Sequence, residues 1–244
     1  MVRIGIVFGV IAQLAVLAAL AGTVGLSAAA ELAGSGVGLV TAVTLTRALD
    51  RSGGYPLGPA NGVTFARAAL VGGVAALVTN SFARSTPLPT LIALATSALL
   101  LDAVDGAIAR RTGTVTAVGA RFDMEVDAFL LVVLSVFVAY RIGPWVLLIG
   151  AARYLFVVAG WLLPWLREPA APRHWCKTVA AIQGVALTIA AADVLPRAAI
   201  DLMLAAALVL LAESFGRQVW WLSRHRVRTH RPVRQVEAVP AAVR

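Results

Sequence analysis

Long apolar runs, separated by short polar segments, follow one another along most of the 244-residue chain. Each run is close to the roughly 20 residues that a helix needs to cross the hydrocarbon core of a bilayer. The pattern predicts an all-α, polytopic membrane bundle of eight helices. Their expected ranges are 4–22, 27–46, 61–83, 88–111, 119–141, 144–163, 177–195 and 198–222.

The N-terminal part of the chain allows two arrangements. Residues 4–49 are apolar almost throughout, and the glycines in GTVG (22–25) and GSG (34–36) both offer a break. We favour a hairpin of two membrane helices that turns near Gly22–Gly25. One long helix followed by a short interfacial helix is the alternative. A cleaved signal peptide is not expected, because Arg3 alone precedes the apolar run and no small-residue cleavage site leads into a soluble domain.

Three regions are expected along the chain. Residues 1–50 form an N-terminal transmembrane extension, and residues 56–222 form a six-helix membrane domain. Residues 223–244 form a basic tail, which contains proline and few large apolar side chains. We expect this tail to be disordered or to lie on the membrane surface on the cytoplasmic side.

Charge adds an orientation to this picture. The chain is 60% hydrophobic and only 14% charged, and its net charge of +9 comes almost entirely from arginine, with Lys177 as the single lysine. The arginines crowd one set of loops and the tail, so the positive-inside rule places both termini and the 102–127 segment on the cytoplasmic side. Arginines in such loops suit anionic membrane lipids, and nucleic acid is not an expected partner. The single cysteine, Cys176, permits no intrachain disulfide.

The segment DAVDGAIARRTGTVTAVGARFDMEVD, residues 102–127, contains four aspartates between apolar runs. Asp102 and Asp105 are spaced i, i+3, and Asp123 and Asp127 are spaced i, i+4, so each pair shares one face of its helix. A short loop joins the two helices and makes them antiparallel neighbours. We therefore expect four carboxylates to converge at similar depth near the cytoplasmic interface.

Charged side chains inside membrane helices are costly and are usually functional. Protonation would relieve the repulsion between the four carboxylates, but divalent cations explain the cluster better, because Mg²⁺, Mn²⁺ and Ca²⁺ prefer hard oxygen ligands. Four carboxylates suit two Mg²⁺ or Mn²⁺ ions about 3.5–4 Å apart, the arrangement that acts on phosphoryl groups. Zinc is not expected, because the sequence has no cluster of histidine and cysteine.

The residues between the two aspartate pairs suit a phosphate ligand. Gly106 and Gly119 leave the backbone open to close approach, Ala109 keeps the helix surface open, and Arg110 offers two parallel hydrogen bonds to a phosphate. For each glycine alone, ordinary packing of small residues between membrane helices is the simpler explanation.

The full pattern at 102–127, D-x2-D-G-x2-A-R-x8-G-x3-D-x3-D, resembles the signature of the CDP-alcohol phosphotransferases, also called CDP-alcohol phosphatidyltransferases. The upstream segment PANGVTFAR (59–67) resembles the family's P-N-x-x-T-x-x-R pattern and departs from it only where Ala60 separates Pro59 from Asn61. The weaker resemblance covers about 56–222, and residues 1–50 fall outside the usual six-helix core. All eight fixed positions of the signature are present: Asp102, Asp105, Gly106, Ala109, Arg110, Gly119, Asp123 and Asp127.

The resemblance implies that a CDP-linked lipid, commonly CDP-diacylglycerol, gives its phosphatidyl group to an acceptor alcohol and that CMP leaves. Asp102, Asp105 and Asp123 are the implied principal metal ligands. Asp127 is the implied fourth carboxylate of the metal site and the best candidate for the general base. The polar residues near Asn61 suit a helix N-cap equally well. The implied CDP-binding residues are Asn61, Thr64, Asp102, Gly106, Ala109, Arg110 and Gly119.

Three basic residues are candidates for acceptor binding. Arg153 lies inside a predicted span and resembles the arginine of family members whose acceptor carries a phosphate; pairing with an aspartate, or snorkelling to the interface, is the alternative. Lys177 begins K-T-x4-Q, an imperfect match to the K-T-x-x-Q run of some glycerol-phosphate and lipid-acceptor members. Arg121 lies two residues before Asp123, within reach of a phosphate or of the headgroup layer.

The rival function is a carboxylate-lined ion or proton transporter, since intramembrane acids also mark ion pathways. The fixed spacing of the signature and the placement of all four acids at one membrane face favour the enzyme, and no inverted repeat typical of transporters is evident. The expected partners are a CDP-lipid donor, an acceptor alcohol with or without a phosphate, anionic lipids and, by family resemblance, a second copy of the chain. The acceptor itself stays open between glycerol 3-phosphate, an inositol phosphate, another polyol phosphate and a lipid.

Overall fold

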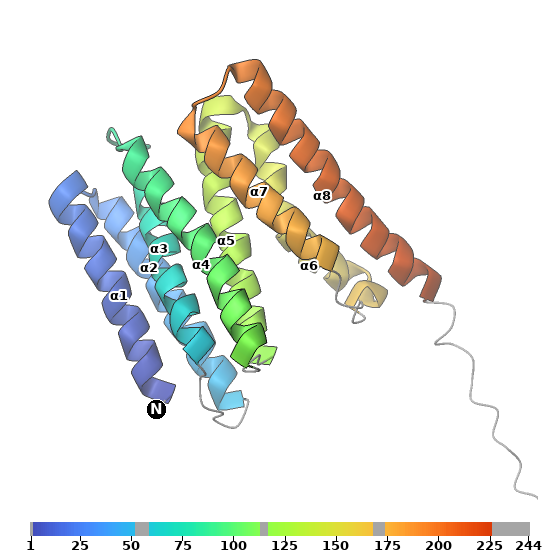
Figure 1. Ribbon diagram of the computed structural model, residues 1–244, viewed down its shortest axis with the longest axis horizontal. Coiled ribbons are helices and arrows are strands. Elements are labelled where there is room, and N and C mark those ends of the chain that lie inside the picture. Colours follow the sequence, from blue (N-terminus) through green and yellow to red (C-terminus); the bar gives the residue numbers. More distant parts are fainter. Residues whose placement is uncertain (1, 52–58, 113–116, 168–173, 226–244) are drawn as a thin grey trace, which may run out of the picture.

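The computed structural model describes residues 2–51, 59–112, 117–167 and 174–225, and these ranges contain eight α-helices and no strand (Figure 1). This confirms the predicted all-α fold. The helices are α1 (Val2–Val24), α2 (Ala28–Arg51), α3 (Pro59–Asn80), α4 (Leu88–Thr112), α5 (Ala117–Ile142), α6 (Leu147–Leu162), α7 (His174–Ala192) and α8 (Arg197–His225).

Prolines begin two short 3₁₀ turns that the apolar pattern does not reveal. The range predicted as one helix, 144–163, begins with a short 3₁₀ turn at Pro144–Val146, and α6 starts only after it. A second 3₁₀ turn, Pro164–Arg167, follows α6. Proline lacks the backbone N–H that a helix interior needs, so it is tolerated at the start of a helical segment.

The N-terminal segment forms the predicted hairpin, so the arrangement with one long helix is wrong. Gly25 adopts a φ of 74°, a conformation that glycine reaches at little cost, and α2 continues unbroken through the second group of glycines. The turn is tied to the end of α3: the Ser27 N–H donates to Asn80 Oδ1 at 2.9 Å, and Arg84 Nη1 donates to the Gly25 carbonyl oxygen at 3.0 Å.

Helix α3 lies at the centre of the bundle and packs against α1, α2, α4 and α5. Its sequence contains ARAALVGGVAAL (66–77), whose small residues let neighbouring helices approach closely. Val71, Val74 and Leu77 on this helix are fully buried. Beyond α5, the helices α6, α7 and α8 form a second group that joins the first through contacts of α5 with α6 and α7, and of α4 with α7.

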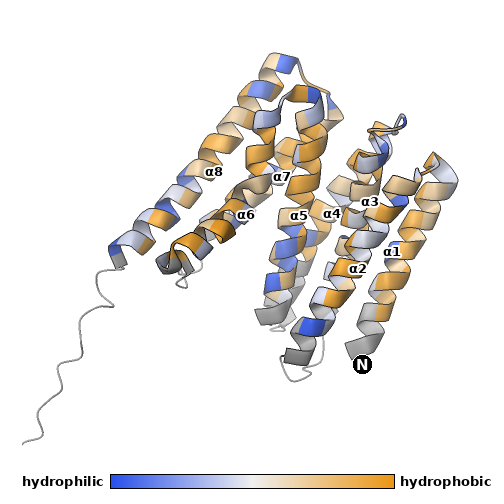
Figure 2. Cartoon of the chain, turned by 180° about the vertical axis from the view of Figure 1, so that it is seen from behind, coloured by the Kyte–Doolittle hydropathy of each residue, from blue (hydrophilic) through white to orange (hydrophobic). Residues whose placement is uncertain are grey.

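Among the described residues, five helical segments are long and apolar enough to cross a membrane: α1, α3, α6 together with the 3₁₀ turn before it, α7 and α8. In α2 and α4 the apolar stretches are shorter, at Ala28–Thr44 and Leu88–Val104. Helix α5 carries acidic residues at its beginning and Arg141 in its last turn, and Figure 2 shows hydrophilic residues along that first part. The chain is an integral membrane protein.

The two ends of the bundle are formed by different sets of helix ends. The first residues of α1 and α5 and the last residues of α4 and α8 lie at the same end (Figure 1). At the opposite end, Arg141 pairs with Asp193 at 3.3 Å and Arg197 pairs with Asp201 at 3.1 Å. The aspartate-bearing parts of α4 and α5 therefore lie toward the end of the bundle opposite to these two ion pairs.

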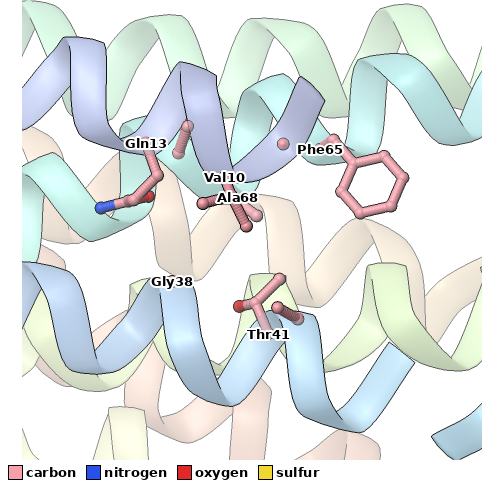
Figure 3. A pocket seen from close by; sticks show the side chains of 9 residues that line it. Val10, Gln13, Gly38, Thr41, Phe65 and Ala68 are labelled. Atoms are coloured by element: carbon pink, nitrogen blue, oxygen red, sulfur yellow. The ribbon is translucent and has the colours of Figure 1, made fainter. Parts of the chain in front are cut away.

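A buried glutamine joins the N-terminal hairpin to α3. Gln13 on α1 is only 4% exposed, and its Nε2 donates to the Gly34 carbonyl oxygen of α2 at 3.1 Å. It lies at one end of a small pocket between α1, α2 and α3, with Phe65 at the other end (Figure 3). A Cβ atom on Gly72 would lie 2.2 Å from Gln13 Nε2. The hairpin can pack this closely only because α3 has no side chain at that position.

We expect Gly72→Ala to destabilise the protein by about 1–3 kcal/mol, because the added methyl group displaces the Gln13 amide from its buried hydrogen bond. Thermal unfolding of the purified protein measures the effect. Gly36→Ala is the matched control, since nothing lies within 4 Å of the added Cβ atom. Equal unfolding temperatures for the two variants would show that the close packing at Gly72 contributes nothing.

Candidate active site

Helices α4 and α5 bring three of the four aspartates together. Asp102 comes from the second half of α4, and Asp123 and Asp127 come from successive turns near the start of α5. One carboxylate oxygen from each lies within 4.8 Å of the other two. Their side chains are between 27% and 37% exposed, so the cluster is half-buried and open on one side.

Arg67 of α3 lies against these three carboxylates. Its side chain is 1% exposed, and its Nη1 contacts Asp102 Oδ1 at 2.5 Å. Its Nη2 contacts Asp123 Oδ1 at 2.6 Å and Asp127 Oδ1 at 3.1 Å, and it donates to the backbone carbonyl oxygen of Asp123 at 3.0 Å. A single guanidinium group therefore connects α3, α4 and α5 at the cluster.

Two aromatic rings lie close to Arg67 and Asp123 in sequence and come from α3 and α5. Phe65 on α3 and Phe122 on α5 lie with their ring centroids 6.0 Å apart, in a tilted arrangement. Such ring pairs stabilise the contact between their helices beyond the area that they bury. The contact adds to the packing of α3 against α5, the two helices that carry Arg67 and Asp123.

Arg153 of α6 finds its partner on α5. Its guanidinium group pairs with Glu125, and its Nη1 lies 2.8 Å from the sulfur atom of Met124. The ion pair therefore involves Glu125, which lies off the face shared by Asp123 and Asp127. The Arg153 side chain is 29% exposed.

The other two acceptor candidates are exposed. Lys177, in the first turn of α7, is close enough to Asp123 for its positive charge to act on that carboxylate. Arg121 is exposed on α5, one turn from Glu125. Gln183, the last residue of K-T-x4-Q, is fully buried instead and donates through Nε2 to the Ala207 carbonyl oxygen at 2.7 Å. That glutamine holds α7 against α8.

The sequence model of the CDP-alcohol phosphatidyltransferase family matches residues 58–220, about two thirds of the chain. The chain belongs to this family. The matched range contains α3–α8, so the family domain is the six-helix part and the N-terminal hairpin lies outside it. Searches of curated proteins and of solved structures found no match.

Membership of the family assigns a reaction class to the site. The protein is a transferase of substituted phosphate groups in lipid synthesis, with a CDP-alcohol as donor and an alcohol as acceptor. The match covers both aspartate pairs and the upstream segment with Arg67. It therefore favours the enzyme over the ion or proton transporter.

The donor set of the cluster suits a divalent metal ion, on which the family generally depends. Three carboxylates can each offer an oxygen within one small volume, and oxygen ligands are those that Mg²⁺ and Mn²⁺ prefer. The guanidinium group of Arg67 offsets one of the three negative charges, which leaves a net negative charge to attract a cation.

The structure describes the surroundings of only some of the remaining predicted site residues. Thr64 is buried on α3, one turn before Arg67, and Gly119 lies on α5, one turn before Asp123. Five other predicted residues belong to helices, but their surroundings lie outside what the structure describes: Asn61, Asp105, Gly106, Ala109 and Arg110.

Arg67 is the residue that the sequence reasoning did not place in the site. It is the final residue of the P-N-x-x-T-x-x-R resemblance, and it lies inside a predicted apolar span. An arginine at such a depth requires a charged partner. That requirement, applied to Arg67 as it was to Arg153, would have pointed to the aspartates.

Proposed function

We propose that this protein transfers a phosphatidyl group from CDP-diacylglycerol to an acceptor alcohol, with release of CMP, in phospholipid synthesis. The observation that carries the proposal is the convergence of Asp102, Asp123 and Asp127 on Arg67 within the family's signature segment. The distribution of arginines supports an active site on the cytoplasmic face, where soluble nucleotides and polar acceptors are found.

The carboxylates are the proposed ligands of two Mg²⁺ or Mn²⁺ ions. Asp102, Asp105 and Asp123 are the principal ligands, and Asp127 is the fourth carboxylate of the set. When bound, such ions neutralise the diphosphate and the negative charge that develops on the leaving CMP. A half-buried cluster suits this task, because its open side admits the nucleotide while its buried side excludes water.

Asp127 is the proposed general base. In the reaction the acceptor hydroxyl oxygen forms a bond to the phosphorus atom of the phosphatidyl group, and the bond between that phosphorus atom and the bridging oxygen of CMP breaks. The hydroxyl proton moves to a carboxylate oxygen of Asp127. The proposed contacts to CDP come from Asn61, Thr64, Asp102, Gly106, Ala109, Arg110 and Gly119.

A panel of acceptor alcohols tests the proposed function directly. Purified protein is incubated with Mg²⁺, CDP-diacylglycerol and, in turn, glycerol 3-phosphate, inositol phosphate, unphosphorylated glycerol and inositol, or a phospholipid acceptor. CMP release is measured, and mass spectrometry identifies the lipid product. We expect one acceptor to give a new phospholipid together with CMP. Absence of CMP with every acceptor, and of Mg²⁺-dependent binding of the CDP-lipid, would refute the proposal.

Arg153 is the proposed contact to the phosphate of a phosphorylated acceptor, with Arg121 and Lys177 as further basic side chains near it. Arg153 lies on α6, and its ion pair holds the guanidinium group against Glu125 of α5, which is two residues from both Asp123 and Asp127 in sequence. A phosphate that enters can take over hydrogen bonds from a carboxylate of this kind, because both are anionic oxygen acceptors.

We expect Arg153→Ala to raise KM for a phosphorylated acceptor by about 10- to 100-fold, the value of one to two charge-assisted hydrogen bonds. KM for the CDP-lipid should stay unchanged. Steady-state kinetics with one substrate varied at a time measures both. Arg217→Ala on α8, where Arg217 pairs with Glu213, is the control for loss of a surface ion pair. An unchanged acceptor KM in Arg153→Ala would refute the phosphate contact.

A further inference from the structure

Arg67 is the most deeply buried charged side chain of the part of the chain that the structure describes. Its side chain is 1% exposed, and it lies within an apolar stretch of α3 long enough to cross a membrane. An isolated guanidinium group at such a place would be strongly destabilising. The protein tolerates Arg67 there because three carboxylates from two other helices surround it.

The relation also holds in the other direction. Asp102, Asp123 and Asp127 bring three like charges into one half-buried volume, and such charges repel one another more strongly there than in water. The Arg67 guanidinium group contacts the Oδ1 oxygen of each. It offsets part of this repulsion and holds the three carboxylates at a common point.

Arg67 is held in position by more than its ion pairs. Its Nη2 donates to the backbone carbonyl oxygen of Asp123, a contact that does not depend on the charge state of any carboxylate. The Arg67 side chain is 1% exposed, whereas the three carboxylate side chains are 27–37% exposed. A cation can therefore reach the exposed parts of the carboxylates from solvent while Arg67 stays in place.

We infer that Arg67 is a positioning residue for the cation site: it holds the carboxylates in their binding arrangement before a divalent cation arrives, and its positive charge lowers the affinity for that cation. The inference rests on the proposed function only in taking these aspartates as cation ligands. A moderate affinity for the cation suits a site from which a nucleotide product must leave in each turnover.

The test compares the full-length protein, purified in detergent, in the presence of EDTA and of saturating Mn²⁺, without CDP-lipid or acceptor. Thermal unfolding gives the unfolding temperature in each condition, and electron paramagnetic resonance of free Mn²⁺ gives the dissociation constant. The variants are Arg67→Gln, which removes the charge, and Arg67→Lys, which keeps the charge but lacks the planar fork that contacts several carboxylates at once. Arg141→Gln is the control, because Arg141 also pairs with an aspartate but at the other end of α5.

The unfolding temperature of Arg67→Gln should fall further below that of the wild type in EDTA than in Mn²⁺, since bound cations replace the missing positive charge. Its Mn²⁺ dissociation constant should fall by about tenfold, because a positive charge a few ångströms from the ion has been removed. The unfolding temperature of Arg67→Lys should also fall further in EDTA than in Mn²⁺. Its Mn²⁺ dissociation constant should stay near that of the wild type. Arg141→Gln should lower both unfolding temperatures equally and leave Mn²⁺ binding unchanged.

A purely structural role for Arg67 gives a different result, namely equal decreases of the unfolding temperature in EDTA and in Mn²⁺. That result, or unchanged or weaker Mn²⁺ binding in Arg67→Gln, overturns the inference. If Arg67→Gln does not yield folded protein even in Mn²⁺, the unfolding temperatures of Arg67→Lys decide on the same criterion. Failure of CMP release with a positive result here would refute the proposed function alone, and absence of Mn²⁺ binding to the wild type would refute the inference.

Discussion

Asp127→Asn is expected to reduce kcat by about 10²- to 10⁴-fold, the usual contribution of a positioned general base. The amide keeps the shape of the side chain but does not accept the hydroxyl proton of the acceptor. Asp127 contacts Arg67 at 3.1 Å, the longest of the three contacts between Arg67 and a carboxylate. Its replacement should therefore disturb the cluster less than replacement of Asp102 or Asp123, and some binding of CDP-lipid should remain.

Single-turnover measurement of CMP release, beside equilibrium binding of the CDP-lipid, separates these two effects. Asp201→Asn is the matched control, because Asp201 also pairs with an arginine but lies on α8 at the opposite end of the bundle. A variant with near-normal kcat would show that Asp127 is not the base. A variant that has lost nucleotide binding in the same proportion as turnover would assign Asp127 to the metal site alone.

The helices of this protein could be predicted because a membrane imposes one physical requirement on the segments that cross it. Backbone polar groups must be satisfied within each helix, so apolar runs of the right length are nearly sufficient evidence. The hairpin at Gly25 was predictable for the same reason, and its φ of 74° confirms the turn. The 3₁₀ turns at Pro144–Val146 and Pro164–Arg167 were not, since the apolar pattern locates a helix end near each proline but does not distinguish a 3₁₀ turn from a turn of α-helix.

The arrangement of the helices was harder to predict than their existence. The central position of α3 follows from its small residues, and this composition is visible in the sequence. The number of helices that pack on α3, however, depends on the shapes of all its neighbours. The fit of Gln13 against Gly72 is of this kind, because its two residues belong to helices far apart in the chain.

The candidate site shows the same limit. The convergence of Asp102 with Asp123 and Asp127 was predictable, because helical spacing and a short connection determine it. The partners of the two arginines were not, because each depends on how one helix is rotated against another. Arg153 was expected to meet an aspartate or the interface, and it meets Glu125. Arg67 meets three aspartates, although no residue near it in sequence is acidic.

Removal of divalent cations is expected to lower CMP release by more than about 10³-fold, because cation binding to a transferred phosphoryl group contributes several kcal/mol of stabilisation to the transition state. EDTA treatment, followed by titration with Mg²⁺ or Mn²⁺, measures the loss and its recovery. The recovery should be complete, because Arg67 holds Asp102, Asp123 and Asp127 together while the cations are absent.

Variants of single aspartates should change the Mg²⁺ concentration that restores activity. Asp123→Asn should need a much higher Mg²⁺ concentration for half-maximal activity than the wild type, because one ligand of the half-buried cluster has lost its charge. Asp201→Asn should titrate as the wild type does, since that residue lies far from the cluster on α8. Activity in EDTA within about tenfold of the value in Mg²⁺ would contradict a cation-dependent reaction. A permanent loss after EDTA would instead mean that the carboxylates do not keep their arrangement without cations.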